Sequence, residues 1–410
     1  MPLVRTRPGG PYFPDVDRGA TLTSGAKSPG PGEPKVDAPE QARGGLVISR
    51  GDRVLVTGAA GFIGSAVTRV LEARGAHVVA MLEPGARLGN LEGLAVERVV
   101  ADVRDAAAVA GAVRGCRIVF HLAARYRFWP PDRRGFYEVN VLGTRNVLHA
   151  AGAAGCERVV YTSTVGALGL ASTVRGGLAD EESAPRIDEL IGLYEQTKYA
   201  AEHEALRAAA EGLPVVLVLP TTPFGPGDEG PSPTGRVVLD FLNGRMVGWV
   251  DTALNVVDVD DVALGQVLAA ERGRNGRSYI LGGENLELRR ILSLLGERTG
   301  LRPPRLPIPG RAVLAASWIS EVLEGRLLHR APTVPIDGAR MAMTRMVFSD
   351  ERARRELGYR SRPAADALER SARWFVENGY VTARRRALIT FAGEHRSGRG
   401  PSAASFRPAD

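Results

Sequence analysis

Short apolar runs alternate with longer amphipathic segments between residues 52 and 220. The apolar runs lie at 54–56, 78–82, 96–100, 118–122, 159–161 and 215–219. The segments between them repeat apolar residues at helical spacing and lie at 62–74, 105–114, 136–154 and 189–211. Strands that alternate with helices predict right-handed βαβ units and a parallel sheet buried on both faces. The predicted fold class is therefore α/β, with a doubly wound parallel sheet.

After residue 220 the pattern becomes less regular and rich in turns, with predicted helices near 259–272, 286–299, 310–325 and 364–378. We assign residues 49–220 to a cofactor domain and 221–380 to a smaller substrate lobe, partly interleaved with the sheet. Residues 1–48 contain eight prolines and eight glycines. That composition predicts a disordered tail, and residues 381–410 are expected to form a second, basic one.

A net charge of +7 would suit a nucleic-acid partner if it lay in the folded body, but +5 of it falls in the two predicted tails. A nearly neutral body disfavours nucleic-acid binding. No apolar run approaches the roughly 18 residues of a membrane span, and the start lacks the pattern of a signal peptide. Two cysteines, Cys116 and Cys156, form neither a disulfide framework nor a metal site. We therefore expect a cytoplasmic protein with a small-molecule substrate, no membrane span and no metal.

A glycine-rich segment joins the first predicted strand to the first predicted helix. Gly58 permits a tight turn, Gly61 lets a diphosphate approach the backbone, and Gly64 lets the helix pack closely on the strand. The first helical residues, Phe62 and Ile63, present backbone N–H groups to the phosphates. This context predicts a dinucleotide-binding Rossmann domain, although a purely structural turn is the alternative.

Acidic residues follow the next two strands. Glu83 is placed to hold the adenosine ribose and favours NAD, whereas nearby Arg87 would accept the 2′-phosphate of NADP. Glu83 is otherwise a solvated loop carboxylate. Asp102, followed by Val103, is placed to contact adenine, or alternatively caps the helix that begins near Arg104.

Tyr194 and Lys198 are four residues apart on a predicted helix and so share one face. A lysine ammonium beside a tyrosine is expected to lower the pKa of the phenol and make it an acid/base catalyst. Ser163 and Thr164 follow the fifth strand, at the sheet edge where ligands bind in open α/β folds. His121, at the end of the fourth strand, is predicted to be a packed structural residue rather than a base.

These motifs together resemble the extended short-chain dehydrogenase/reductase family, the NAD-dependent epimerase/dehydratase group. The motifs are Thr57-Gly58-x-x-Gly61-x-x-Gly64, Asp102-Val103, His121-Leu122-Ala123-Ala124, Asn140-Val141-x-Gly143-Thr144, Tyr161-Thr162-Ser163-Thr164 and Tyr194-x-x-x-Lys198. Segments such as Tyr126-Arg127-Phe128-Trp129 and Pro220 to Pro226 are similar to hopanoid-associated sugar epimerases and dihydroflavonol 4-reductases.

The resemblance implies a role for each matching residue. Tyr194 is the general acid/base, Lys198 holds the nicotinamide ribose, and Thr164 binds the substrate oxygen, with Ser163 the second choice. Asn140 braces the sheet. The remaining cofactor contacts implied are Asp102, Val103, Ala123, Ala124, Pro220 and Thr221. The candidate substrate residues are Tyr126, Arg127, Trp129, Ser163, Thr222, Arg236 and Arg245. A homodimer that packs the helices near 136–154 and 189–211 is also implied.

The sequence departs from the family pattern at three places, and the first two narrow the expected activity. Thr222 stands where nucleotide-sugar enzymes carry an asparagine, Val165 and Gly166 replace the Asp-Glu pair of dehydratases, and Asp258 replaces a histidine. We expect hydride transfer on an alcohol/ketone pair, as in a sugar epimerase. A net carbonyl reductase similar to dihydroflavonol 4-reductase stays open, as does a dinucleotide-sensing protein without catalysis.

Overall fold

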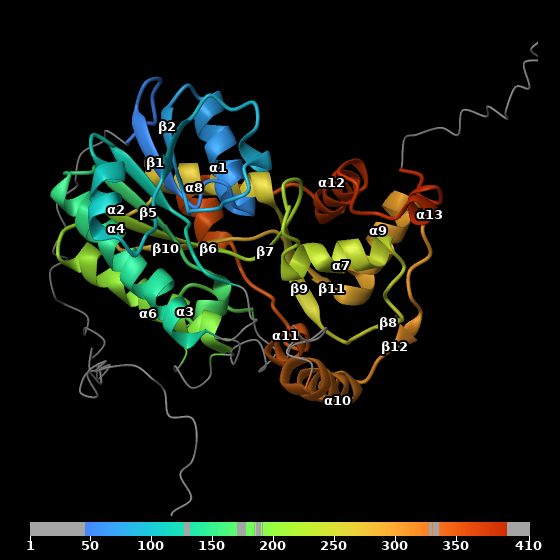
Figure 1. The fold of residues 1–410 in the computed structure, drawn as a ribbon. Coiled ribbons are helices and arrows are strands. Elements are labelled where there is room, and N and C mark those ends of the chain that lie inside the picture. Colours follow the sequence, from blue (N-terminus) through green and yellow to red (C-terminus); the bar gives the residue numbers. More distant parts are fainter. Residues whose placement is uncertain are drawn as a thin grey trace, which may run out of the picture. The chain divides into compact units, whose positions relative to one another are not determined.

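The computed structural model describes residues 46–126, 132–169, 178–183, 185, 190, 192–327, 330 and 336–391. Seven parallel strands form the large sheet, in the order β10-β6-β5-β4-β1-β2-β3 (Figure 1). In chain order these strands are β1 (Arg53–Thr57), β2 (His77–Leu82), β3 (Glu97–Val100), β4 (Ile118–His121), β5 (Arg158–Thr162), β6 (Val215–Pro220) and β10 (Ser278–Leu281). The predicted parallel α/β sheet is confirmed, and β10 adds a strand from beyond residue 220.

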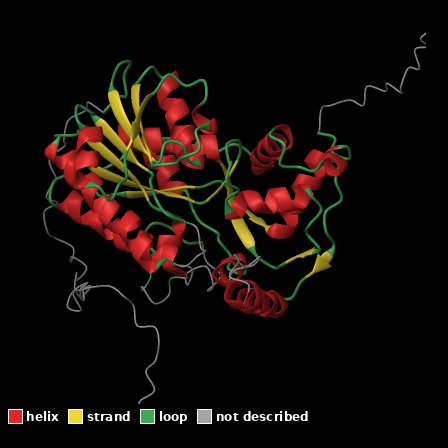
Figure 2. Cartoon of the chain, viewed as in Figure 1, coloured by secondary structure: helices red, strands yellow, loops and turns green. Residues whose placement is uncertain are grey.

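Helices cover both faces of this sheet (Figure 2). On one face lie α1 (Phe62–Ala73) and α8 (Val259–Arg272), packed against each other. On the other lie α2 (Ala106–Val113), α4 (Gly143–Ala153) and α6 (Gly192–Ala210). Alternate strand residues supply the two cores, since Val54 and Val56 face one helical layer and Leu55 the other. A short helix α3 (Arg133–Tyr137) runs through a π-helical turn at Glu138–Leu142 into α4.

A smaller lobe follows β6 and has its own core. Its three-stranded sheet, in the order β11-β9-β7, consists of β7 (Thr222–Phe224), β9 (Ala253–Asp258) and β11 (Glu284–Glu287). The helices that pack on it are α7 (Pro233–Leu242), α9 (Leu288–Thr299) and α12 (Ala364–Glu377). The remaining elements are β8 (Gly248–Trp249), β12 (Leu306–Pro307), α10 (Gly310–Ser320), α11 (Ile336–Ala342) and α13 (Ala383–Arg386). No helix among the described residues is long and apolar enough to cross a bilayer.

The chain is ordered beyond both limits predicted for the folded body. Val381 and Phe391 are buried in the core of the lobe, and the Arg373 guanidinium lies 4.1 Å from the centre of the Phe391 ring. Ile48 is buried against the large sheet, and its N–H donates to the Glu271 carboxylate at 3.2 Å. Composition alone placed residues 46–48 and 381–391 in tails, because single apolar residues give no periodic signal.

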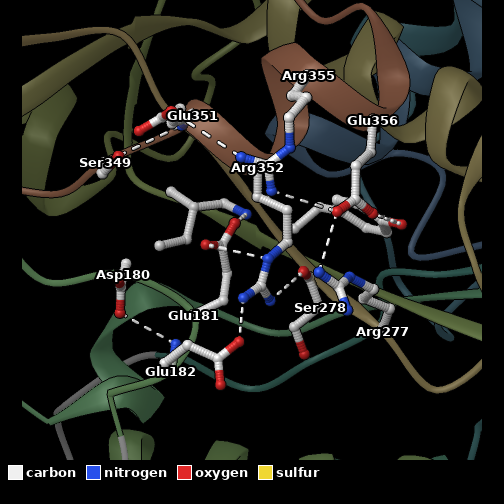
Figure 3. A network of polar contacts seen from close by, with 12 residues as sticks. Asp180, Glu181, Glu182, Arg277, Ser278, Ser349, Glu351, Arg352, Arg355 and Glu356 are labelled. Carbon is white, nitrogen blue, oxygen red and sulfur yellow. Dashed lines mark hydrogen bonds and ion pairs between the residues drawn. The ribbon is translucent and has the colours of Figure 1, made fainter. Parts of the chain in front are cut away.

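Charged side chains cover the outer edge of the large sheet at β10 (Figure 3). The buried Glu181 carboxylate accepts the Ile280 N–H at 2.8 Å, and the Arg352 guanidinium donates to the Ser278 carbonyl at 3.2 Å. Arg352 also pairs with Glu182. Burial raises the pKa of Glu181. These contacts occupy backbone groups that an uncovered edge strand would offer to another chain.

Asp258, the residue that departs from the family's histidine, links α8 to α12. Its fully buried carboxylate caps α8 by accepting the Asp260 N–H at 2.8 Å and binds the Arg370 guanidinium at 2.8 Å. Arg362 lies 3.6 Å away and binds Asp261 at 2.7 Å. Because α8 also packs against α1, this cluster fastens the lobe to the cofactor side of the molecule.

Replacing Asp258 with Asn tests this link. The amide still caps the helix but removes the charge that faces Arg370, so we expect unfolding free energy to fall by about 2 kcal/mol. Urea denaturation measures the change. Glu97→Gln, in an exposed pair with Arg53, serves as the control and should cost less than about 1 kcal/mol. Equal losses in the two variants would contradict the assigned role.

Candidate active site

The glycine-rich loop between β1 and α1 is tightly packed. Gly58 has a φ of +66°, and a Cβ there would lie 3.0 Å from the Ala123 backbone. A Cβ on Gly64 would lie 2.1 Å from the Gly58 carbonyl oxygen. Side chains at these positions would therefore force the loop apart, as the sequence predicted for Gly58 and Gly64.

The N-terminus of α1 suits an anion. Gly61 precedes the helix, and no side chain caps the first-turn N–H groups that begin at Phe62 and Ile63. Twelve aligned peptide units add a positive dipole end at the same place. These features fit the diphosphate of a dinucleotide, which supplies the phosphate oxygens that the loop lacks as partners.

The residues expected at the adenosine end follow their strands as predicted. Glu83 lies directly after β2 and is exposed, and Arg87 donates to the Glu229 carbonyl at 3.5 Å. Asp102 forms an ion pair with Arg104 at 2.6 Å, which lowers the pKa of Asp102. The alternative that Asp102 caps α2 is wrong, because Asp105 accepts the Ala107 and Ala108 N–H groups at that end.

The remaining residues implied as cofactor contacts lie in three backbone segments. Val103 is buried against Gly143, where a Cβ would lie 2.7 Å from the valine Cγ2. Ala123 donates its N–H to the Thr57 hydroxyl at 3.1 Å, and Ala124 follows, partly buried. Pro220 ends β6 beside Leu281, and Thr221 donates its N–H to the Leu281 carbonyl at 3.3 Å.

Tyr194 and Lys198 lie one turn apart on α6, opposite the end of β5. Thr164 hydrogen-bonds the Tyr194 phenol, and the Thr164 hydroxyl also accepts the Gly166 N–H at 3.2 Å. Lys198 is buried, and its ammonium donates to the Thr162 carbonyl at 2.6 Å. The same ammonium lies 4.5 Å from the centre of the Tyr161 ring. Thr164 and Tyr194 are therefore brought together, whereas the Lys198 ammonium lies one turn further along α6, at the Thr162 carbonyl.

Burial governs the protonation of this group more than charge does. The pKa of Tyr194 is raised by burial, although the Thr164 hydrogen bond opposes the rise. The lowering expected from Lys198 is not seen, because Lys198 is not among the groups that shift the pKa of Tyr194. Burial also lowers the pKa of Lys198 to about 7, against the opposing charge of Glu202.

The structure separates the two adjacent hydroxyls that the sequence left as alternatives. Ser163 is buried and donates its hydroxyl hydrogen to the Glu202 carboxylate at 2.5 Å, whereas Thr164 bonds Tyr194. Glu202 was not identified from the sequence. Its spacing of four residues after Lys198 on α6 was the available signal.

A chain of buried hydrogen bonds connects the base of the glycine loop with α6. Thr57 bonds His121 Nδ1 at 2.8 Å, and His121 Nε2 bonds Thr144 at 2.9 Å. Thr144 donates to the Asn140 carbonyl at 2.6 Å, and Asn140 Nδ2 donates to the Thr197 hydroxyl at 2.9 Å. Burial lowers the pKa of His121 to about 3, so the ring is neutral. This arrangement matches the structural role predicted for His121 and the bracing role implied for Asn140.

The candidate substrate residues lie farther apart than the acid/base candidates Thr164 and Tyr194. Tyr126 is exposed and close enough to Tyr194 to influence its pKa. Arg127 and Trp129 lie outside the described residues. Thr222 is buried in β7 and its hydroxyl donates to the Asn255 carbonyl, so it has no hydrogen left for a substrate.

Two arginines of the lobe lie on its surface. Arg236 is exposed on α7, where its charge acts on Asp228. Arg245 lies after α7, 3.6 Å from Asp240. Neither Arg236 nor Arg245 is therefore buried as a substrate-clamping arginine would be.

Asn90 is a further residue that the sequence did not reveal. Its amide nitrogen donates to the Ala60 carbonyl at 3.2 Å and to the Gly227 carbonyl at 2.8 Å. It thereby joins the glycine loop to the first turn of the lobe. Nothing in its loop sequence distinguishes it, because both partners are backbone atoms.

A sequence model described as the NAD dependent epimerase/dehydratase family matches residues 54–282. A putative dihydroflavonol 4-reductase from Synechocystis is 41% identical over 82% of this chain and 97% of its own. Sterol demethylase protein B from Methylococcus capsulatus is 36% identical over 80% and 99%, respectively.

A solved structure has a similar fold. The crystal structure of a nucleoside-diphosphate-sugar epimerase from Pseudomonas aeruginosa is 27% identical, with a TM-score of 0.67 over 81% of this chain and 99% of that one. The chain belongs to the NAD-dependent epimerase/dehydratase family of extended short-chain dehydrogenases/reductases. It is an enzyme of a family of NAD-dependent oxidoreductases, epimerases and dehydratases.

The depressed pKa of His121 predicts a pH dependence of stability. The unfolded chain binds a proton on this ring below about pH 6.5, whereas the folded chain does so only near pH 3. His121 therefore costs the folded state up to about 1.4 kcal/mol per pH unit as the pH falls through this window. Urea midpoints at pH 7 and pH 5 should differ less in His121→Asn than in the native chain. An equal difference in both proteins would show that His121 is not neutral in the fold.

Proposed function

We propose that the protein interconverts a secondary alcohol and a ketone, with Tyr194 as general acid/base. The observation that carries the proposal is the contact of Thr164 with Tyr194, one helical turn from a buried Lys198. The bound nicotinamide supplies the hydride acceptor or donor. Tyr194 exchanges a proton with the substrate oxygen while Thr164 hydrogen-bonds that oxygen, and the Lys198 ammonium supplies a positive charge one turn away on the same helical face.

Net reduction or oxidation is favoured over epimerisation. The two curated relatives compared above are a putative reductase and a protein of sterol demethylation, both over 35% identical. In addition, Thr222 uses its hydroxyl within β7 and β9, at the place where nucleotide-sugar enzymes carry an asparagine. A sugar epimerase is the second candidate, supported by the likeness to the nucleoside-diphosphate-sugar epimerase.

We assign the cofactor to the large sheet, within residues 49–220, and the substrate to the lobe from residue 221. The effect of Tyr126 on Tyr194 supports a substrate position near the Tyr194 phenol, on the side of the loop that follows β4. A homodimer through α4 and α6, which pack side by side, remains part of this proposal.

Tyr194→Phe tests the catalytic assignment. Loss of the phenol hydroxyl removes the proton donor, so kcat/KM should fall about a thousandfold while NADH binding stays within twofold of the native value, roughly as general acid–base catalysis predicts. The matched control is Tyr199→Phe on the same helix. The Tyr199 ring packs against the His203 ring, with the two ring centres 4.3 Å apart. The turnover of this variant should be unchanged. Full activity in Tyr194→Phe would refute the mechanism.

The assay should contain a panel of ketones together with UDP- and dTDP-sugars. Stoichiometric loss of NADH with a ketone supports the reductase. Conversion of a nucleotide sugar without net change in NADH supports the epimerase.

Glu83 is expected to make NAD(H) the preferred cofactor, because its carboxylate repels the 2′-phosphate of NADP(H). Fluorescence titration should give NADH the lower Kd, and Glu83→Gln should narrow the ratio of the two Kd values about tenfold. Arg87, which could accept that phosphate, is held toward Glu229. Tighter binding of NADPH by the native protein would reverse the assignment.

A further inference from the structure

We propose that Ser163 and Glu202 form a positioning pair that favours the charged form of Lys198, whose ammonium binds the neighbouring Thr162 carbonyl one turn of α6 from Tyr194. The inference rests on the proposed function, in which Lys198 acts through Tyr194. It gives a role to a buried carboxylate and to a hydroxyl that the catalytic step does not use.

Ser163 and Glu202 are held in place by a hydrogen bond to each other and by the elements that carry them. The Ser163 hydroxyl donates to Glu202 Oε2 at 2.5 Å, and both side chains are buried. The Ser163 N–H donates to the Val218 carbonyl at 2.8 Å, which fixes its backbone against β6. Glu202 follows Lys198 by one turn of α6, on the face that carries Tyr194.

Glu202 provides the negative charge that acts on Lys198. Desolvation lowers the pKa of the ammonium, and Glu202 is the group that raises it. The titratable groups that face Lys198 are Tyr194 and Glu202 from α6, His121 from β4 and Tyr161 from β5. His121 is neutral, and burial raises the pKa of both tyrosines, so none of these three offers a negative charge near neutral pH.

Ser163 acts on Lys198 indirectly, through Glu202. Burial raises the pKa of Glu202, which favours the uncharged acid, and the Ser163 hydrogen bond opposes that rise. The other titratable groups near Glu202 are Tyr161, Tyr199, His203 and Lys198. Ser163 thus favours the ionised form of Glu202, and an ionised Glu202 favours the protonated form of Lys198.

The lysine content of the chain makes this proposal directly measurable. The sequence contains three lysines, namely Lys27, Lys35 and Lys198. NMR of protein labelled with carbon-13 at lysine Cε therefore gives one signal from α6 and two from residues near the N-terminus. Lys198→Met identifies the signal, and its pH titration reports the pKa of Lys198 without any substrate.

Glu202→Gln is the decisive variant, because the amide oxygen still accepts the Ser163 bond while the charge is lost. We expect the Lys198 midpoint, near pH 7 in the native chain, to fall by about one pH unit. Ser163→Ala should shift it in the same direction by less, and provides the test if Glu202→Gln does not fold. The matched control is Glu204→Gln, which removes a carboxylate on α6 that pairs with Arg145 instead, and should leave the midpoint in place.

A Lys198 midpoint that is unchanged in Glu202→Gln or Ser163→Ala would overturn the proposal. The result is separable from the proposed function. A shifted midpoint in an enzyme whose Tyr194→Phe variant is fully active would retain the positioning pair and refute the catalytic assignment. Loss of activity in Tyr194→Phe with no shift of the Lys198 midpoint in Glu202→Gln would support the catalytic assignment and refute the positioning pair.

Discussion

Polar groups buried at the carboxyl edge of the large sheet must keep their hydrogen-bond partners, and the geometry of the site depends on that constraint. Thr57, His121, Thr144, Asn140 and Thr197 satisfy one another in a continuous series. An unmatched donor or acceptor in this position would cost on the order of 1–3 kcal/mol. The strand that carries the glycine loop and the helix that carries Tyr194 are therefore held in one relative position.

The π-helical turn at Glu138–Leu142 belongs to the same constraint. Asn140 lies within it, accepting the Arg125 N–H at 2.7 Å and donating to the Arg125 carbonyl at 3.0 Å. Such a turn shifts the side chains of a helix out of their regular spacing, and π-turns often occur at functional sites. Here it lets one amide bind the loop that follows β4 and α6 together.

Local signals in the sequence predicted much of this arrangement. Apolar runs located the strands, glycines with a required conformation located the glycine-rich loop between β1 and α1, and the spacing of Tyr194 and Lys198 placed them on one helical face. Contacts between distant segments were not predictable in the same way. Glu202 with Ser163, Asn90 with Gly227, and Asp258 with Arg370 join residues 39, 137 and 112 positions apart. Each residue taken alone resembles an ordinary surface polar residue, and only the fold brings it to its partner.

The choice of lysine at position 198 follows from burial. Arginine supplies nearly all the positive charge of this chain, and Lys198 is the one lysine after residue 35. A guanidinium stays charged in almost any environment and presents a broad planar group. A lysine ammonium is compact, fits between the Thr162 carbonyl and the Tyr161 ring, and has a pKa that desolvation can bring close to neutrality. A group whose charge is so finely balanced responds to each nearby carboxylate, which is why the ionisation of Glu202 matters at this position and would not matter beside an arginine.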